Sequence, residues 1–431
     1  MSASRPLTPL LLLAVVLLGQ ACSHGPRPPE SLPDFYRAPL PIPGTQPGHV
    51  IRHEPLTGFA ALEDAASNER VLYRSNAVAG DRPIAVSGII ALPKGPPPEG
   101  GWPIVSWAHG TVGVADVCAP SRDTLGAAAH VFNQAPHRLL NLLLRNGYAV
   151  VMTDYEGLGT VGRHPFLLGD SEARGVLDIV RAARNLYPDV LSTKFAIAGH
   201  SQGGQAALFA AARAAQRLAG SGLEPVGVIA YAPASAILGL FRLGIAQTQP
   251  FEGAAFIPMY FTGAAEGDPE HIQLDSLLKD ARARELYSHV DTRCRVELSA
   301  ADSWGGINVK DTVLAPDADL GALEAQLEAM HPGTLNIPIP LRLVQGRLDT
   351  RVDPLQTLRV YSELTQRGAN IDYVGCPFAD HFGVMGDDLP GMLGWLRQRF
   401  TGQPPDPAWT SSCAPLTPEE LRSAGAPGST R

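Results

Sequence analysis

The 431 residues carry a formal net charge of -8, and 45% of them are hydrophobic whereas only 18% are charged. This balance fits a globular chain with a sizeable core and excludes an intrinsically disordered one. Because arginine and lysine are scattered without a basic run, the composition also argues against nucleic acid as a partner.

The first segment of the chain is typical of an export signal. Arg5 supplies a positive charge, residues 10–18 form an apolar run too short to span a bilayer, and Gly19–Ala21 resemble a cleavage site. We therefore expect residues 1–21 to be a signal peptide. The mature protein would be exported, either secreted or retained in the periplasm or cell envelope. A core helix is the alternative, and the proline-rich tract that follows argues against it.

Cys22 directly follows the expected cleavage site and is a candidate for lipid attachment. A lipobox usually has leucine three residues before the cysteine, where this chain has Gly19, so a lipoprotein and a freely exported protein both stay open. The five cysteines favour the lipid slightly, because Cys22 would be left over once the others pair. Residues 22–50 are rich in proline and predict a tether or an extended arm.

Short β-branched runs then alternate with helical segments. We expect strands at 84–92, 103–109, 148–155, 194–200, 226–232, 339–346 and 371–376, and helices at 136–146, 171–187 (capped by Ser171), 203–219, 354–367 and 388–400. This alternation predicts an α/β fold with a mostly parallel sheet and helices on both faces.

The alternation stops between residues 235 and 335, where only helix-like pieces such as 275–290 and 321–331 occur. We expect an inserted, mainly helical subdomain there, between core segments 51–234 and 336–401. The tail from 402 to 431 contains several prolines and is expected to be irregular, with Cys413 anchoring it.

Gly199-His200-Ser201-Gln202-Gly203 matches the G-x-S-x-G pattern, in which a serine occupies a sharp turn from a strand into a helix. The pattern alone is weak evidence for a catalytic serine. Its context is an apolar, strand-like run before the serine and an alanine-rich, helix-like run after it. We interpret Ser201 as a nucleophile, and a glycine-rich turn with a capping serine is the alternative.

A serine nucleophile needs a histidine base, which in this arrangement follows the serine and an acid along the chain. Of the histidines after Ser201, three fall within 235–335, and only His381 lies beyond the last expected strand. A surface-loop histidine without a catalytic role is the alternative. For the acid we prefer Asp349, just after the strand at 339–346. Asp353 precedes Pro354 and suits a helix N-cap, and Asp380 adjoins His381 too closely.

The tetrahedral oxyanion needs N–H donors that are already in place. We assign one to the amide of Gln202 and the other to the amide of Thr111, in the loop after the strand at 103–109, with Gly110 as the alternate. His109 and His200 are interpreted as loop and packing residues. Because the sequence has no zinc, P-loop or complete dinucleotide motif, we expect no metal and no cofactor.

Four strings together resemble the secretory lipase family of α/β-hydrolases, typified by Candida lipase A: residues 153–184, 199–210, 343–354 and 379–383. The resemblance covers most of residues 70–400. It implies a triad of Ser201, Asp349 and His381, a helical cap over 235–335, and hydrolysis of acylglycerols and other acyl esters. Thr111 matches the oxyanion loop by position, although the family varies there.

The resemblance also implies two disulfides, Cys118 with Cys294 and Cys376 with Cys413. The sequence alone leaves three pairings of these four cysteines open.

We therefore predict an exported serine ester hydrolase, a lipase or broad esterase, that acts on small acyl esters or lipids and contacts a lipid interface. The first alternative is an acyltransferase, or a hydrolase of polyesters or aromatic esters, with the same triad. A non-catalytic binding protein on a hydrolase scaffold is a more distant alternative, because all three triad residues are present.

Overall fold

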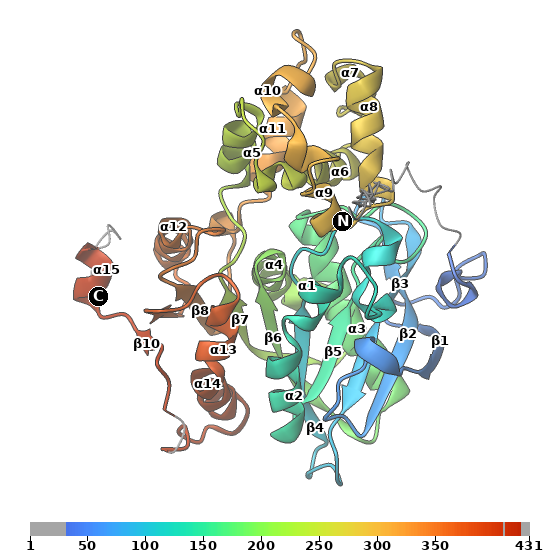
Figure 1. Ribbon diagram of the computed structural model, residues 1–431. Coiled ribbons are helices and arrows are strands. Elements are labelled where there is room, and N and C mark those ends of the chain that lie inside the picture. The colour runs from blue at the N-terminus through green and yellow to red at the C-terminus, as the bar shows by residue number, and fades with distance from the viewer. Residues whose placement is uncertain (1–31, 408–409, 424–431) are drawn as a thin grey trace, which may run out of the picture.

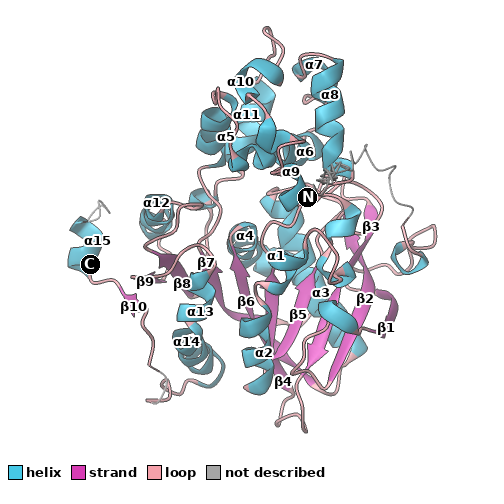
Figure 2. Cartoon of the chain, in the orientation of Figure 1, coloured by secondary structure: helices cyan, strands magenta, loops and turns pink. Residues whose placement is uncertain are grey.

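The structure is a computed structural model that describes residues 32–407 and 410–423, so the expected signal peptide and Cys22 lie outside the described residues. One ten-stranded sheet forms its centre, in the order β1-β2-β3-β5-β4-β6-β7-β8-β9-β10 (Figure 2). The strands are β1 (Val50–Pro55), β2 (Ser67–Asn76), β3 (Pro83–Leu92), β4 (Trp102–Ala108), β5 (Ala149–Thr153), β6 (Leu191–His200), β7 (Glu224–Tyr231), β8 (Leu341–Gly346), β9 (Ile371–Cys376) and β10 (Ala414–Pro415).

The six neighbouring strands β5, β4, β6, β7, β8 and β9 run parallel. At one side of the sheet β1, β2 and β3 join antiparallel, and at the other edge β10 does so as well. The expected α/β fold with a mostly parallel sheet is confirmed, and the seven expected strands coincide with β3 to β9. Three strands, β1, β2 and the two-residue β10, were not expected. The first four residues of β2 are polar and only partly buried, so this part of the strand lacks the apolar run that marks the central strands.

Helices cover both faces of the sheet. On one face α3 (Gly169–Leu186), α4 (Gln202–Arg217) and α12 (Pro354–Gln366) share an apolar cluster with the strands. On the other face α2 (His137–Arg145), α13 (Gly383–Asp387) and α14 (Leu389–Thr401) share a second one, and the short α1 (His130–Gln134) precedes α2. Both clusters are rich in leucine, isoleucine, valine and alanine, so burial of apolar surface stabilises the layers.

Between β7 and β8 the chain leaves the sheet and forms helices that gather beyond one end of it (Figure 1). They are α5 (Ile237–Ile245), α6 (Phe256–Gly267), α7 (Leu274–Leu277), α8 (Ala281–Ser288), α9 (Arg295–Leu298), α10 (Val309–Thr312) and α11 (Gly321–Ala329). They enclose a separate apolar cluster that includes Trp304, Phe241 and Phe261. The piece at 275–290 is not one helix, because Asp280 caps α8 by accepting a hydrogen bond from the Ala283 amide.

One capping prediction is wrong. Helix α3 begins at Gly169 after Leu168, so Ser171 lies inside its first turn instead of capping it. Ser171 is buried, and its hydroxyl donates to Glu156 Oε2 at 2.5 Å. A tertiary partner has therefore drawn this serine away from the capping role that its sequence position suggested.

Both ends of the described chain pack against the sheet. Phe35 and Tyr36, in the proline-rich segment, are buried against Leu72 of β2 and Ala85 of β3. At the other end the tail is not wholly irregular, because β10 pairs with β9 and a short helix, α15 (Pro418–Ser423), follows.

Two disulfides join segments that are distant in sequence. Cys118 bonds to Cys294 and Cys376 bonds to Cys413, which are the two pairs that the family resemblance implied. The first connects the loop region after β4 to the inserted helices, and the second connects β9 to the tail. Within residues 32–407 and 410–423, no helix combines the length and apolar character needed to cross a membrane.

Candidate active site

Ser201 occupies the turn between β6 and α4. Its φ of 58° lies in the left-handed region, which a non-glycine residue adopts only when its surroundings enforce it. The Ser201 amide donates to the carbonyl of Tyr231 at 2.9 Å, and the Ser201 carbonyl accepts from the Ala234 amide at 3.0 Å. The segment after β7 therefore stabilises a strained turn that presents the serine at the carboxyl end of the sheet.

Two glycines permit this turn by allowing the backbones to approach closely. A Cβ on Gly199 would lie 2.0 Å from the carbonyl oxygen of Gly203, and a Cβ on Gly203 would lie 1.9 Å from that of Ala108. Neither position has room for a side chain. The glycines of the G-x-S-x-G pattern therefore have a steric role here, as that pattern requires.

His381 and Asp349 reach the same end of the sheet from different loops. Asp349 follows β8, and His381 lies between β9 and α13. The Nδ1–H of His381 donates to Asp349 Oδ2 at 2.7 Å, and both residues are buried. When the imidazole is neutral, a proton on Nδ1 leaves Nε2 with a lone pair that can accept a proton.

The surroundings of Asp349 favour its ionised form. Burial alone raises the pKa of this carboxyl. The hydrogen bond and charge of His381 and the backbone amides of Val352 and Arg351 lower it by more, so that the pKa lies below its ordinary value. The two amides donate to Oδ1 at 2.9 and 2.8 Å. A fixed carboxylate of this kind can orient an imidazole and stabilise its protonated form.

The other two candidate acids are engaged elsewhere. Asp353 caps α12 by accepting a hydrogen bond from the Leu355 amide at 2.8 Å, as expected for a residue before Pro354. Asp380 accepts from the amides of Phe382 and Gly383 at the start of α13. Of the three aspartates, the structure brings Asp349 to His381.

His200 lies directly beneath the His381 loop. Its Nε2–H donates to the backbone carbonyl of His381 at 2.6 Å, and the two rings lie 4.5 Å apart. Burial, with a smaller contribution from His381, lowers the pKa of His200 to about 3, so the ring is neutral. The packing role expected for His200 agrees with these contacts.

The residues assigned to the oxyanion site lie around Ser201. A Cβ built on Gly110 would lie 3.7 Å from Cβ of Ser201, so the loop after β4 lies beside the serine. Thr111 follows in the same loop and lines the same cavity as Ser201. Gln202 is the first residue of α4, where an N–H has no acceptor within the helix.

A buried network that the sequence analysis did not identify holds the Gln202 side chain. His164 donates from Nδ1 to the carbonyl of Glu156 at 3.0 Å, and burial lowers the pKa of His164 to about 3, which leaves Nε2 as an acceptor. The Gln202 amide nitrogen donates to this Nε2 at 2.9 Å and to Glu172 Oε1 at 2.7 Å. Both N–H groups of the side chain are thereby used.

The surroundings of Glu172 in this network favour its protonated form. Burial raises its pKa to about 8, against smaller opposing effects from Gln202 and the Leu167 amide. His164 Nε2 lies 3.9 Å from Glu172 Oε1, but because both groups are neutral this contact is not an ion pair. The only signal for Glu172 and His164 in the sequence was their place within residues 153–184.

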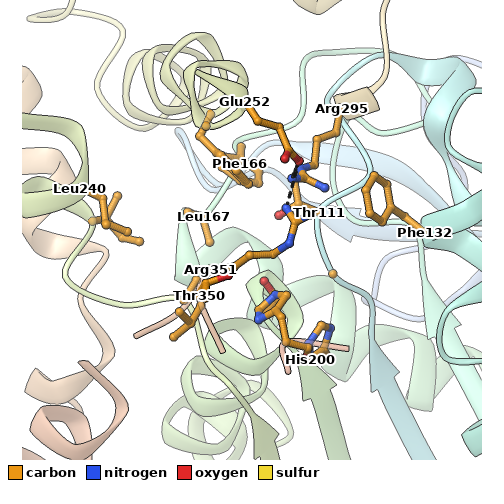
Figure 3. Close-up of a pocket in the computed structure, with 18 of the residues that line it drawn as sticks. Thr111, Phe132, Phe166, Leu167, His200, Leu240, Glu252, Arg295, Thr350 and Arg351 are labelled. Atoms are coloured by element: carbon orange, nitrogen blue, oxygen red, sulfur yellow. Dashed lines mark hydrogen bonds and ion pairs between the residues drawn. The ribbon is translucent and has the colours of Figure 1, made fainter. Parts of the chain in front are cut away.

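Ser201 and His381 open into one cavity of about 440 Å³, part of which is drawn in Figure 3. Its walls are mostly apolar and come from both the sheet side and the inserted helices. The sheet side contributes Trp107, Phe132, Phe166, Leu167, Phe382 and Met385, and the inserted segment contributes Ile237, Leu240, Leu243, Phe251, Phe256, Ile257 and Tyr260.

Three charged residues also line the cavity, namely Arg295, Glu252 and Arg351. Arg351 lies within residues 343–354, which carry the family resemblance, whereas no motif pointed to Arg295 or Glu252. Within the described part of the chain, no group of three or more histidine, cysteine, aspartate or glutamate side chains is arranged to hold a metal ion.

Comparison with known families matches residues 125–407, more than half of the chain, to the family described as Secretory lipase. Among curated proteins, Lipase A of Moesziomyces aphidis is 24% identical over 400 residues, which cover 86% of this chain and 80% of the relative. A Mycobacterium tuberculosis protein named "Probable inactive lipase" is 24% identical over 382 residues, which cover 86% of this chain and 82% of that protein.

Solved structures show the same fold. Candida antarctica lipase A in its closed state superposes with a TM-score of 0.73 at 22% identity, and the match covers 89% of each chain. The rice cell wall degrading esterase LipA from Xanthomonas oryzae superposes with a TM-score of 0.64 at 18% identity, covering 83% of this chain and 99% of that one. The expected α/β-hydrolase fold is thus confirmed.

Proposed function

This chain belongs to the secretory lipase family, and on that premise we propose that it is an exported serine ester hydrolase of the lipase or broad esterase type. One observation carries the proposal. The strained serine of a strand-to-helix turn and a histidine bonded to a buried carboxylate both line one apolar cavity. This combination supplies a nucleophile, a base and a place for an acyl chain.

In the proposed reaction, Nε2 of His381 accepts the hydroxyl proton of Ser201 while Oγ attacks the ester carbonyl carbon. The amides of Gln202 and Thr111 donate to the resulting oxyanion. Collapse of this intermediate breaks the bond to the alcohol, which leaves with the proton from His381. Water, activated by the same histidine, then attacks the acyl-enzyme and releases the acid. Asp349 stabilises the imidazolium in both halves of the reaction.

The cavity walls support acyl esters as substrates. Residues 235–335 would act as a cap, because they contribute about half of the apolar lining and would set the preferred acyl length. Contact with a lipid surface stays part of the proposal, and Leu243 of α5, which lines the cavity and is 64% exposed, is the residue we expect to make it. An acyltransferase, or a hydrolase of polyester or aromatic esters, would use the same triad and differ in the acceptor or pocket shape.

Export is supported by the disulfides, which form and persist in oxidising compartments. Lipid attachment at Cys22 remains part of this proposal. If Cys22 is acylated, Cys22→Ser should move the protein from the membrane fraction to the soluble fraction of the cell envelope. A wild-type protein that is already soluble there would contradict the lipid anchor.

The catalytic proposal is tested by Ser201→Ala, and the inactive designation of one relative makes this test necessary. We expect hydrolysis of p-nitrophenyl acyl esters to fall to background while the circular dichroism spectrum is unchanged. In the wild type, a fluorophosphonate probe should label Ser201, and the variant should not react. Undiminished turnover by Ser201→Ala would refute the assignment, and an unlabelled, inactive wild type would favour a non-catalytic binding protein.

A further inference from the structure

The cavity that contains Ser201 holds a cluster of two arginines and one glutamate (Figure 3). Arg295 Nη2 lies 3.1 Å from Glu252 Oε1, and Arg351 Nη1 lies 3.3 Å from the same oxygen. Two guanidinium groups thus converge on one carboxylate oxygen. They come from different parts of the chain, α9 and the loop after β8, and Glu252 begins the short helix η5 (Glu252–Ala255).

The cluster leaves the cavity with a surplus of positive charge. Apart from His381, which is bonded to Asp349, its described lining residues with charged side chains are Arg295, Arg351 and Glu252. Burial, followed by the positive charge of Arg351, lowers the pKa of Arg295 to about 10 despite the attraction of Glu252. The single carboxylate therefore compensates the two cations incompletely, and a second anion would relieve the imbalance.

Arg295 is fixed in place from several directions. Its amide donates to the carbonyl of Val112 at 2.9 Å, and the adjacent Cys294 is bonded to Cys118. Its guanidinium lies 4.6 Å from the ring of Phe132. Among the residues that the structure describes, Nε of Arg295 has no hydrogen-bond partner, although it is buried. The guanidinium edge formed by Nε and Nη2 could bind a carboxylate through two bonds, but Glu252 contacts it through Nη2 alone.

The backbone of Arg351 is held by its amide, which donates to Asp349 Oδ1 at 2.8 Å, and its side chain is 36% exposed. Glu252 differs from both arginines, since its side chain is 61% exposed and its helix has only four residues. Arg295 is therefore held within the core beside the disulfide, Arg351 is anchored through its backbone, and the carboxylate between them is the most exposed of the three side chains.

We propose that Arg295 and Arg351 form a subsite for an anionic group, a carboxylate or a phosphate, carried by the ester substrate. Glu252 occupies this subsite when no substrate is bound and moves outward when the substrate anion enters. The inference rests on the proposed ester hydrolysis and adds a substrate class to it. Charge-assisted bonds from two guanidiniums would bind such a group and orient the ester with respect to Ser201.

Two matched pairs of substrates test the subsite and identify where the anion is carried. The p-nitrophenyl monoester of adipic acid is compared with p-nitrophenyl heptanoate, which places the charge on the acyl side. The hexanoyl ester of 2-hydroxyethyl phosphate is compared with 2-hydroxyethyl hexanoate, which places it on the alcohol side. For each pair the measured quantity is the ratio of kcat/KM for the anionic ester to kcat/KM for the neutral ester.

The variants are Arg351→Gln, Glu252→Gln and the control Arg242→Gln. Arg242 is an arginine of α5 that pairs with Glu324 and does not line the cavity. In one or both pairs, Arg351→Gln should lower the ratio about tenfold, the size expected for one lost charge-assisted contact. Glu252→Gln should raise it several-fold, because it removes the competing carboxylate. Arg242→Gln should leave the ratio unchanged.

The subsite requires that the ratio of kcat/KM values falls in Arg351→Gln and rises in Glu252→Gln. If Arg351→Gln and Glu252→Gln change both members of a pair equally, the cluster only bridges the inserted helices to the core, and the subsite is refuted. Unchanged ratios in both variants refute it as well. Turnover of the neutral esters, abolished by Ser201→Ala, separates these outcomes from a failure of the proposed function.

Discussion

Single aspartates in the loop after β8 have different tasks although they lie close together in the chain. Asp349 accepts the Nδ1–H of His381, whereas Asp353 accepts the Leu355 amide at the start of α12. The first contact selects the tautomer of the proposed base. The second satisfies one of the free N–H groups of a helix terminus.

Replacing each aspartate by alanine should therefore separate catalysis from stability. Asp349→Ala should lower kcat about 10³–10⁴-fold, because His381 loses the partner that orients its ring and stabilises its protonated form. Asp353→Ala should keep kcat within about twofold and lower the free energy of unfolding by about 1 kcal/mol. Steady-state kinetics and urea denaturation of both variants provide the measurements. If Asp353→Ala lowered kcat more than Asp349→Ala, Asp353 and not Asp349 would be the acid that orients His381.

The raised pKa of Glu172 predicts how the stability of the protein depends on pH. Its pKa is raised to about 8, whereas a glutamate in an unfolded chain has a pKa of about 4.3. Between these values the native state binds more protons than the unfolded state, so this group lowers the free energy of unfolding as the pH rises. Its stabilising contribution is complete below about pH 4.3 and is lost by about pH 8.

Glu172→Gln removes this titration while its Oε1 can still accept from Gln202 and Leu167. The stability of the variant relative to the wild type should increase with pH between about 5 and 8, by up to about 1.4 kcal/mol per pH unit. Denaturant titrations of both proteins at several pH values measure the difference, and effects of other groups cancel in it. Parallel stability curves would show that Glu172 is ionised in the native protein.

Among the elements, the strand–turn–helix unit of β6 and α4 depends most closely on its glycines. Helix α4 approaches β4 at Gly203, where even a methyl group would meet the carbonyl oxygen of Ala108. Gly239 in α5 offers a contrast, because a Cβ there has no neighbour within 4 Å.

Gly203→Ala should therefore destabilise the protein by at least about 3 kcal/mol or prevent folding, since backbone atoms must shift to make room. Gly239→Ala should stabilise it by about 0.5–1 kcal/mol, because alanine is the better helix former. Thermal unfolding of the two variants tests this pair. Equal tolerance at both positions would contradict the close packing at the turn.

The arrangement of the whole molecule decides the shape of the cavity, since its walls come from both the sheet side and the inserted helices. We expect Leu240→Trp, which adds volume within the cavity, to shift the preferred acyl chain to shorter lengths. Val296→Trp is the matched control, because Val296 belongs to the same inserted segment but is exposed and does not line the cavity. A series of p-nitrophenyl esters from acetate to palmitate measures the profile, and an unchanged profile in Leu240→Trp would argue against a cap that sets chain length.

Much of the fold and of the candidate site follows from the sequence alone. The apolar central strands, the alternation with helices and the glycine-flanked Ser201 are local patterns, because strand and helix periods and turn requirements act over a few residues. The expected order of serine, acid and histidine along the chain then left His381 as the candidate base. Strands β1 and β2 were not predicted because β1 has no fully buried residue and β2 begins with polar, partly buried ones. The Ser171 cap was wrong because its hydroxyl donates to the Glu156 carboxylate instead.

Only the tertiary structure decided which groups meet. It brings Asp349 to His381, pairs four cysteines for which the sequence left three pairings open, and surrounds the side chain of Gln202 with His164 and Glu172. It also places two arginines around Glu252, one of them 99 positions away. Such contacts depend on how the inserted helices and separate loops pack at one end of the sheet. Local propensity and spacing carry no information about that packing.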